Sequence, residues 1–444
     1  MGRLFGTDGA RGIAGSELTA DLAMKIGASA AYILGENKKI KVIVGMDTRY
    51  SGDMLACAVN AGLLSMGADV IFVGVVPTPA VSFLVTHLKA DMGVMISASH
   101  NPAKYNGIKL FNNKGYKLAD EIEEKIEHYI LDEKLPECTN IGRYERDENL
   151  KNKYINFLCT LANDYNGLKV VVDCANGSAS ATAPTLFEKL NVNAKIIFDN
   201  PDGVNINDNC GSTHLDNLIN YVKKNKFDLG IAFDGDADRC LFVDEDGNII
   251  DGDYILAIVA LNLKKKNKLK NNTLVGTILS NLGLIKFCNE NDINFSATKV
   301  GDRYVLEEMI LKDYVIGGEQ SGHIIFKELA TTGDGELTAL QILSIISEEN
   351  KSLKECSKIM KKYPQVSRNI KVKNEDKKEV FTNDEINNVI NKSKDILKDT
   401  GRIIVRPSGT EPLIRVMIEG NDLDLINQLL NDIAHVIENK IGIK

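Results

Sequence analysis

The chain has 444 residues, which at roughly 150 residues per domain corresponds to about three domains. Hydrophobic residues make up 44% of the sequence and charged residues 26%, which is typical of a folded globular protein. The net charge of −8 argues against a general nucleic-acid-binding protein, because displacing counterions from phosphates needs a basic surface.

Cysteine use and hydropathy predict a cytoplasmic protein. The eight cysteines are scattered and form no CxxC pair, which is typical of reduced thiols. Residues 1–12 lack the apolar run of a secretory signal. The most apolar stretch, residues 70–85, is broken by Gly74, Pro77 and Pro79, so it does not suit a membrane span.

The chain begins with a glycine-rich loop and a helix. Residues 4–12 (LFGTDGARG) carry Asp8 and Arg11, and such a loop lets backbone amides and a guanidinium approach phosphate oxygens. Thr19 fits the cap of a helix whose apolar residues follow at helical spacing, and Gly35 fits its end. Residues 41–44 then predict a buried strand that leads into the loop GMDTRYSG.

The stretch MISASHNPAKYNGIKLF, residues 95–111, combines a strand end, a polar turn and a second apolar run. It carries Ser99, His100 and Lys109, and a hydroxyl and an imidazole in a proline-set turn suit a reactive site. An inert Ser/Asn-Pro turn fits the same residues. A Ser/His hydrolase is excluded, because adjacent residues of an extended chain face opposite ways and no G-x-S-x-G elbow surrounds Ser99.

Two later stretches repeat the strand–loop–helix start of residue 41. KVVV at 169–172 runs into DCANGSAS, and TLVG at 273–276 runs into TILSNLG. The fold class predicted is therefore α/β, with three related α/β domains that have mixed, mostly parallel sheets. Functional loops in such sheets gather at the carboxyl ends of the strands. The tail, with helical patterns around strands that flank RPSGTEP, predicts a C-terminal α+β domain.

Proline residues and charged stretches indicate the domain boundaries. We expect α/β domains over residues 1–150, 151–252 and 253–366, and the α+β domain over residues 367–444. The basic run KKKNKLK at residues 264–270 is interpreted as a solvated helix end or loop, because the chain as a whole is acidic.

The strongest chemical signal is DLGIAFDGDADRCLFVD, residues 228–244. Asp234, Asp236 and Asp238 follow a predicted strand, and alternate residues of an extended chain point the same way. Three uncompensated carboxylates repel one another, and a hard divalent cation relieves this repulsion. Arg239 fits a counter-charge or a phosphate contact. An EF-hand is disfavoured, because Arg239 stands where the sharp turn needs glycine.

Two further loops suit recognition of a sugar phosphate. GGEQSGH at residues 317–323 offers Glu319, Ser321 and His323 as hydrogen-bonding partners for vicinal hydroxyls. RPSGTEPLIR is typical of a phosphate-binding loop, through its arginines, hydroxyls and glycine: Arg406, Ser408, Gly409, Thr410 and Arg415. No Walker A or G-x-G-x-x-G fingerprint is present, so no nucleotide cofactor is implied.

These motifs, in this order, resemble the phosphohexomutase superfamily over essentially the whole chain. INDNCGSTH, VGDRYVLEEM and TTGDGELTAL add to the resemblance. It implies an active site at the junction of four domains, which carry the phosphoserine, metal-binding, sugar-recognition and phosphate-binding loops in turn. Ser99 would be the phosphoserine that donates a phosphoryl group to the sugar, through a bisphosphosugar intermediate, and accepts one back.

The resemblance also implies roles for the other site residues. Asp234, Asp236 and Asp238 would hold one Mg²⁺ per active site together with the Ser99 phosphate. Arg11, Lys109 and Arg239 would neutralise the phosphoryl charge, because phosphoryl transfer needs mainly alignment and charge stabilisation. His100 and Lys109 are both candidates for the base, and the sequence does not choose between them. Glu319, Ser321 and His323 would contact the sugar, and the tail loop would bind the phosphate that does not react.

Within the superfamily, the resemblance favours an isomerase acting on glucosamine phosphates, which would supply amino-sugar nucleotide synthesis for a bacterial cell wall. The alternative within the superfamily is a mutase that uses the same mechanism on mannose or glucose phosphates. Two alternatives of other classes are a non-catalytic regulator that binds phosphosugars and a metal-dependent phosphatase. A sugar bisphosphate is expected as activator and intermediate. The other partners considered are a second copy of the chain, in a homodimer, and a kinase that first phosphorylates Ser99.

Overall fold

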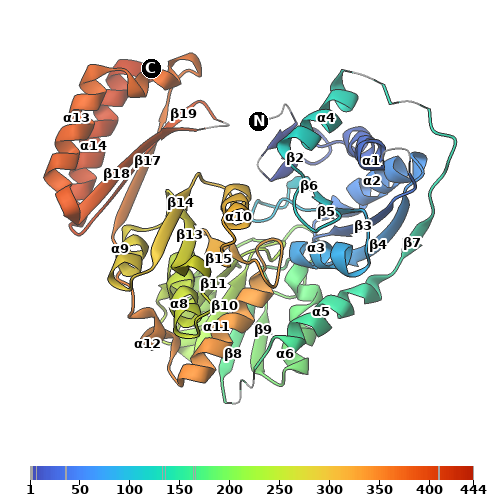
Figure 1. Ribbon diagram of the computed structural model, residues 1–444, viewed down its shortest axis with the longest axis horizontal. Helices are drawn as coiled ribbons and strands as arrows, with labels where there is room; N and C mark the ends of the chain where they lie inside the picture. Colours follow the sequence, from blue (N-terminus) through green and yellow to red (C-terminus); the bar gives the residue numbers. More distant parts are fainter. Residues whose placement is uncertain are drawn as a thin grey trace. The chain divides into compact units, whose positions relative to one another are not determined.

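The computed structural model describes residues 4–6, 8–35, 38–132, 134–135, 137–163, 165, 167–408 and 411–443. The chain divides into two compact units. Unit 1 comprises Met1–Leu279 and Asn291–Ile359, and unit 2 comprises Ser280–Glu290 and Met360–Lys444. Figure 1 shows the helices and strands of each unit.

Unit 1 begins with a seven-stranded sheet in the order β1-β2-β6-β5-β3-β4-β7. Strands β5, β3, β4 and β7 run parallel to one another, whereas β6, β2 and β1 pair antiparallel. The strands are β1 (Phe5–Gly6), β2 (Gly9–Ile13), β3 (Lys41–Met46), β4 (Asp69–Val75), β5 (Met92–Ile96), β6 (Tyr105–Asn112) and β7 (Tyr144–Arg146). The helices are α1 (Ala20–Gly35), α2 (Gly52–Ser65), α3 (Thr78–His87) and α4 (Asp120–Leu131).

Different helices cover the two faces of this sheet (Figure 1). Val42 and Val44, two residues apart on β3, join a core that includes residues of α1, α2 and α4. Helix α3 packs on the other face, where a Cβ on Gly93 would lie 2.7 Å from Val85. Side chains of a strand alternate between faces, so both faces of this sheet are buried by apolar residues.

The second and third sheets of unit 1 are also mixed, in the orders β12-β11-β10-β8-β9 and β14-β13-β15-β16. Each has parallel strands together with an antiparallel edge. The second sheet has β8 (Lys169–Asp173), β9 (Asn193–Ile197), β10 (Leu229–Phe233), β11 (Cys240–Asp244) and β12 (Ile249–Ile250), with helices α5 (Lys151–Thr160), α6 (Ala183–Lys189) and α7 (Asp216–Asn225). The third has β13 (Thr273–Thr277), β14 (Asn294–Thr298), β15 (Ile316–Gly318) and β16 (Ile324–Phe326), with α8 (Gly252–Lys265), α10 (Asp302–Leu311), α11 (Gly335–Glu349) and α12 (Leu353–Ser357).

A buried polar network connects elements of unit 1 that are far apart in sequence. The Tyr154 hydroxyl of α5 donates to Asp334 Oδ1 at 2.8 Å, and Asp334 also caps the N-terminus of α11. The Thr182 hydroxyl, just before α6, donates to Glu336 Oε1 at 2.6 Å. All four side chains are fully or almost fully buried, so the network fixes α5, α6 and α11 against one another.

Unit 2 is a three-stranded antiparallel sheet with amphipathic helices. Its strands lie in the order β17-β19-β18, with β17 (Gln365–Lys371), β19 (Leu413–Gly420) and β18 (Gly401–Pro407). Residues of α13 (Asp384–Leu397) and α14 (Leu423–Ile441) form its core together with the sheet. Helix α9 (Leu282–Glu290) belongs here because Asn281 and the Leu282 N–H hydrogen-bond the Glu419 carboxylate of β19 at 3.1 Å each.

The fold class predicted from the sequence is confirmed. The strand starts at residues 41, 169 and 273 correspond to β3, β8 and β13, and each has parallel neighbours. The predicted limits of the four domains stay a prediction. None of the helices in the described ranges combines the length and the apolar character that a membrane crossing requires.

Candidate active site

The serine loop, residues 97–104, begins where β5 ends. Ser99 is buried, and its φ of +51° lies in the left-handed region that residues other than glycine seldom adopt. Its N–H donates to Ser97 Oγ at 2.9 Å, and its own Oγ donates to Asp234 Oδ2 at 2.6 Å. The loop therefore directs the predicted nucleophile at a carboxylate that follows a strand of the second sheet.

The aspartate loop, residues 234–239, follows β10. One carboxylate oxygen each from Asp234, Asp236 and Asp238 can be chosen so that the three lie within 4.8 Å of one another. The backbone is a turn, in which the Ala237 N–H donates to the Asp234 carbonyl at 3.1 Å and Ala237 has a φ of +54°. A turn, and not alternation along an extended chain, brings the carboxylates together.

The electrostatics of the aspartate loop favour a bound cation. Burial, together with Asp238 and Asp236, raises the pKa of Asp234 to about 8. Within the described ranges, Asp236 Oδ1 and Asp238 Oδ1 are buried without a hydrogen bond, although His323 Nδ1 and Arg239 Nε lie 3.7 and 3.8 Å from Asp238 Oδ1. Such oxygens are costly to bury, and a hard cation that prefers oxygen ligands would satisfy them. The donor set therefore fits Mg²⁺.

Two glycines allow other segments to approach the backbone of the aspartate loop. The Gly335 N–H donates to the Ala237 carbonyl at 2.9 Å, and a Cβ on Gly335 would lie 2.5 Å from the Arg239 carbonyl oxygen. A Cβ on Gly177 would lie 2.4 Å from the Gly235 carbonyl oxygen. A side chain at either glycine would therefore displace the loop.

Lys109 of β6 lies among carboxylates from two sheets. Its Nζ is 2.7 Å from Asp236 Oδ2, 3.3 Å from Asp238 Oδ2 and 3.2 Å from Asp8 Oδ2. Burial alone would lower the pKa of Lys109, but the three carboxylates raise it well above its ordinary value. Lys109 is therefore held as a cation, which suits charge neutralisation better than proton abstraction.

A second group of ion pairs extends this cluster to the third sheet. Asp8 pairs with Arg11 and with Lys117, and Lys117 Nζ also lies 2.6 Å from Asp302 Oδ2 at the start of α10. Asp8 and Arg11 stand out in the sequence, in a glycine-rich loop, whereas Lys117 and Asp302 do not. Their signal is weak, because one charged residue after an apolar strand or at a helix start is common on protein surfaces.

His100 and Arg239 flank Ser99. The Ser99 Oγ and His100 Nδ1 are 3.5 Å apart, and Arg239 Nη1 is 3.1 Å from the same nitrogen. Burial, Arg239 and Arg11 lower the pKa of His100 to about 4, so the imidazole is neutral near pH 7. The expectation that Ser99 and His100 face opposite ways is wrong, because the left-handed turn at Ser99 is not an extended backbone.

The loop between β15 and β16 carries the three polar side chains that were predicted to contact the sugar. Glu319 Oε1 accepts the Gly301 N–H at 3.0 Å. Ser321 Oγ is buried and, among the residues described, has no hydrogen-bond partner. His323 is buried with its Nδ1 3.7 Å from Asp238 Oδ1, so this loop lies beside the aspartate loop.

In unit 2, two arginines of the predicted phosphate loop lie opposite each other. Arg406 of β18 and Arg415 of β19 are cross-strand partners, and burial together with Arg415 lowers the pKa of Arg406. Arg415 Nε is buried without a hydrogen-bond partner in the described part of the chain. Like charges directly opposite one another destabilise a sheet. Glu411 Oε2 lies 2.6 Å from Arg415 Nη2 and offsets part of this charge, and an anion that also reaches Arg406 would offset the rest.

The rest of the tail loop is described in part. The Ser408 Oγ accepts the Glu411 N–H at 3.3 Å, and Lys377 Nζ donates to the Ser408 carbonyl at 2.9 Å. Lys377 is a cation near this loop that the sequence reasoning did not single out. Gly409 and Thr410 lie outside the described residues.

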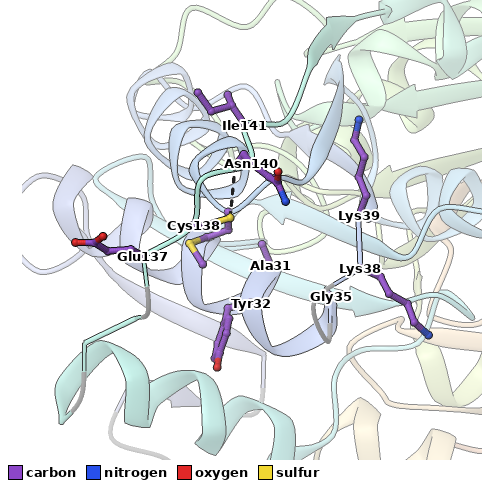
Figure 2. Close-up of a pocket in the computed structure, with 11 residues that line it drawn as sticks. Ala31, Tyr32, Gly35, Lys38, Lys39, Glu137, Cys138, Asn140 and Ile141 are labelled. Carbon is purple, nitrogen blue, oxygen red and sulfur yellow. Dashed lines mark hydrogen bonds between the residues drawn. The ribbon is translucent and has the colours of Figure 1, made fainter.

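A separate hollow of about 630 Å³ is lined by other residues (Figure 2). Tyr32 of α1, Cys138 and Asn140 lie around it, and the Cys138 thiol donates to the Asn140 carbonyl at 3.5 Å. Lys38 and Lys39 extend their ammonium groups in different directions at its edge. None of the site residues named above lines this hollow.

Comparison with known protein families gives four consecutive matches. Residues 2–137, 149–247 and 251–363 match phosphoglucomutase/phosphomannomutase alpha/beta/alpha domains I, II and III. Residues 369–436 match the phosphoglucomutase/phosphomannomutase C-terminal domain. The matches follow one another in domain order over most of the chain.

Individual proteins give the same result. A phosphoglucosamine mutase from Clostridium botulinum is 53% identical over 448 residues, which cover 99% of this chain and 100% of that protein. A phosphoglucomutase/phosphomannomutase family protein from Burkholderia thailandensis has a similar structure, with a TM-score of 0.81, 23% identity and coverage of 99% and 98%. An Aspergillus fumigatus N-acetylphosphoglucosamine mutase, solved with GlcNAc-6P and magnesium, has a TM-score of 0.68, 15% identity and coverage of 99% and 96%.

Proposed function

The chain belongs to the phosphoglucomutase/phosphomannomutase family, and on this premise we propose that it is an isomerase interconverting glucosamine 6-phosphate and glucosamine 1-phosphate. The identity of 53% to a phosphoglucosamine mutase over the full length of both proteins supports this substrate. The product is an amino-sugar phosphate of the kind that amino-sugar nucleotide synthesis consumes.

Ser99 carries the phosphoryl group in this proposal. The bond between Ser99 Oγ and phosphorus breaks while phosphorus bonds to a free sugar hydroxyl oxygen. The proton of that hydroxyl passes through a base to the departing Ser99 Oγ. The bisphosphosugar then reorients, and its other phosphoryl group returns to Ser99. The observation that supports this most directly is the position of Ser99 Oγ, 2.6 Å from Asp234 Oδ2 in the carboxylate cluster.

Asp234, Asp236 and Asp238 would hold one Mg²⁺ per active site, with the Ser99 phosphate as a further ligand. The bound cation supplies positive charge against the phosphoryl oxygens. The orphaned oxygens of Asp236 and Asp238 support this assignment, as does the magnesium in a fold relative. Arg11, Lys109 and Arg239 supply further charge from the protein, and a fixed charge array stabilises phosphoryl transfer without reorganisation.

His100 is proposed as the proton acceptor, because its neutral imidazole lies beside Ser99 while Lys109 is held as a cation by three carboxylates. Accepting the proton on Nδ1 requires Arg239 Nη1, now 3.1 Å from that nitrogen, to move to the phosphoryl oxygens. Glu319, Ser321 and His323 bind the sugar hydroxyls. The tail loop binds the phosphate that is not reacting, through Arg406, Ser408, Gly409, Thr410 and Arg415. Binding energy at that remote phosphate orients the reacting end.

The test is intact-mass spectrometry before and after exposure to glucose 1,6-bisphosphate. We expect the wild type to gain one phosphoryl group and to show mutase activity. Ser99→Ala is expected to do neither, while Ser16→Ala, at an exposed serine, behaves as the wild type. A wild type that gains no phosphate, or a fully active Ser99→Ala variant, would contradict the proposal.

Turnover on three sugars separates the proposed substrate from its alternative. The ratio of kcat/KM for glucosamine, glucose and mannose phosphates is expected to favour glucosamine phosphate. A preference for a neutral sugar would favour the phosphoglucomutase or phosphomannomutase activity instead. Net release of inorganic phosphate would indicate a phosphatase, and binding without turnover a regulator.

A cytoplasmic location, a homodimer and an activating kinase complete the proposal. Eight free cysteines support a reducing compartment. Light scattering would measure the mass of the assembly. Ser99 that is already phosphorylated in cells unable to make the sugar bisphosphate would support the kinase, and unmodified Ser99 in such cells would contradict it.

A further inference from the structure

One buried arginine outside the groups assigned above donates to four backbone carbonyls, three of them in the serine loop and the fourth at Tyr105, the first residue of β6. Arg49 follows β3, and only 2% of its surface is exposed. Its Nη2 donates to the carbonyls of Ser99 at 2.9 Å and Asn101 at 2.7 Å. Its Nη1 donates to the carbonyls of Pro102 at 2.7 Å and Tyr105 at 2.9 Å. The guanidinium thus ties the backbone of the serine loop to the start of β6.

Asp47 completes this arrangement. Its Oδ2 accepts the fifth guanidinium N–H, from Arg49 Nε, at 2.9 Å. The same oxygen accepts the Ser97 hydroxyl at 2.6 Å, and Ser97 Oγ in turn accepts the Ser99 N–H at 2.9 Å. The carbonyl of Ser99 is therefore held by Arg49 directly, and its N–H is held through Asp47 and Ser97.

Ser99 needs such support because of its backbone conformation. A left-handed φ costs a residue with a Cβ about 1–2 kcal/mol, and glycine, which avoids the cost, has no hydroxyl to phosphorylate. Asn207, from a loop of the second sheet, adds a donor to the Ser99 carbonyl at 2.9 Å. Strain of this kind persists only where surrounding contacts over-determine the conformation.

We propose that Arg49 is a positioning residue for phosphoryl transfer, because its fork of donors fixes the turn that presents Ser99 Oγ to the aspartate loop. Arg49 would touch neither substrate nor metal and would act through the backbone of the serine loop. The inference rests on the proposed role of Ser99 as phosphoryl carrier. Lysine at this position keeps the charge but cannot reproduce a planar fork with five donors.

The variants are Arg49→Lys and Arg49→Ala, with Arg146→Lys as the control. Arg146 is exposed, pairs with Glu148 and lies 5.5 Å from the centre of the Phe72 ring, so its replacement tests an Arg→Lys change away from the serine loop. For each variant we would measure kcat, KM, the rate of Ser99 phosphorylation by glucose 1,6-bisphosphate and the Tm.

Arg49→Lys is expected to lower kcat and the rate of Ser99 phosphorylation by about 10- to 100-fold, because small misplacement of a reacting group costs about this much. KM is expected to stay within about twofold of the wild type, since no substrate-binding group changes. Added guanidinium is expected to raise kcat of Arg49→Ala at least about tenfold at a constant Tm, whereas methylammonium does not. Arg146→Lys is expected to match the wild type.

Wild-type kcat in Arg49→Lys would overturn the inference. A fall in Tm that accounts for the lost activity, with no rescue by guanidinium, would overturn it as well. If Arg49→Ala does not fold, the kcat and KM of Arg49→Lys decide the question. A wild type that is never phosphorylated on Ser99 contradicts the proposed function, whereas a phosphorylated wild type matched by Arg49→Lys contradicts only the role of Arg49.

Discussion

At the scale of single residues, Lys109 and the expected cation satisfy different oxygens of the same carboxylates. Asp236 and Asp238 direct Oδ2 at Lys109 and leave Oδ1 without a hydrogen bond among the residues described. Removing one partner of a buried charge cluster leaves the remaining charges uncompensated, which strongly destabilises the folded state. A bound cation should therefore restore part of the folding stability that is lost when Lys109 is replaced.

Lys109→Met is expected to lower the stability of unit 1 by about 3–5 kcal/mol when EDTA removes divalent cations. Mg²⁺ should then raise the Tm of this variant by more than it raises the Tm of the wild type. Differential scanning calorimetry with EDTA and with Mg²⁺ measures both shifts. The control is Lys104→Met, at the exposed last residue of the serine loop. Equal increases in Tm with Mg²⁺ in all three proteins would contradict the expectation.

Glu336 gives a prediction for pH dependence. Burial and Asp334 raise its pKa from 4.5 to about 8, against the hydrogen bond from Thr182. The folded state therefore binds this proton more tightly than the unfolded state, and stability falls as pH rises from about 4.5 through 8. At about 1.4 kcal/mol per pKa unit, the full loss is roughly 5 kcal/mol.

Glu336→Gln resembles the protonated carboxyl at every pH. We expect its stability to be close to that of the wild type at pH 5 and several kcal/mol higher at pH 9, as measured by urea unfolding. Glu121→Gln, on the exposed side of α4, should differ little from the wild type at either pH. A Glu336→Gln variant whose advantage does not grow between the two pH values would rule out a buried, protonated Glu336.

Some of the candidate site could be predicted from the sequence and some could not. Ser99 and the three aspartates stand out because their polar motifs interrupt apolar runs at strand ends. Arg49 does not, because a charged residue in GMDTRYSG is typical of an exposed loop. Only the folded serine loop shows that four carbonyls converge on it. Convergence of backbone groups depends on tertiary structure and has no local pattern.

At the scale of elements, α1 and α2 approach each other closely enough to require glycine. A Cβ on Gly62 would lie 2.0 Å from the Met24 carbonyl oxygen, and one on Gly27 would lie 2.4 Å from the Val59 carbonyl oxygen. The sequence predicts helix α1 correctly from its apolar spacing and its Thr19 cap, which accepts the Leu22 N–H at 3.1 Å. It does not predict which helix packs against α1, because small residues fit many interfaces.

Gly62→Ala is expected to destabilise unit 1 by about 1–3 kcal/mol or more, because the helices must separate to admit the methyl group. Helix propensity alone would favour alanine by up to about 1 kcal/mol, so the sign of the change identifies the steric effect. Ala61→Ser, at an exposed position of the same helix, is the control. Thermal unfolding compares the three proteins, and a Tm for Gly62→Ala above that of the wild type would contradict the close contact.

At the scale of the whole molecule, each unit has a hydrophobic core of its own. Ile418 is fully buried in the core of unit 2, on the central strand β19, and Ile231 is fully buried on β10 of unit 1. Residues 280–290 belong to unit 2 although unit 1 supplies the chain on both sides. A sequence that is divided into consecutive domains places residues 280–290 with their neighbours in the chain. Their contact with unit 2, such as that between Asn281 and Glu419, joins residues far apart in the chain.

Ile418→Ala and Ile231→Ala form a matched pair, each expected to cost about 2–5 kcal/mol. Calorimetry should resolve two unfolding transitions. Ile418→Ala should lower the midpoint temperature of the transition that Mg²⁺ does not shift. Ile231→Ala should lower the midpoint temperature of the transition that Mg²⁺ shifts upward. A single transition lowered by both variants would mean that the two units unfold as one.

Gly177 and Gly335 have a consequence for protein engineering. Neither has a side chain that could take part in chemistry, yet each gives another backbone segment room to approach the aspartate loop. A designer who transplants only the three aspartates into a different α/β scaffold would transfer the ligands without the supports that shape their turn. The portable unit is therefore a three-segment assembly, and a graft that omits the two glycine segments should lose metal affinity even with every carboxylate present.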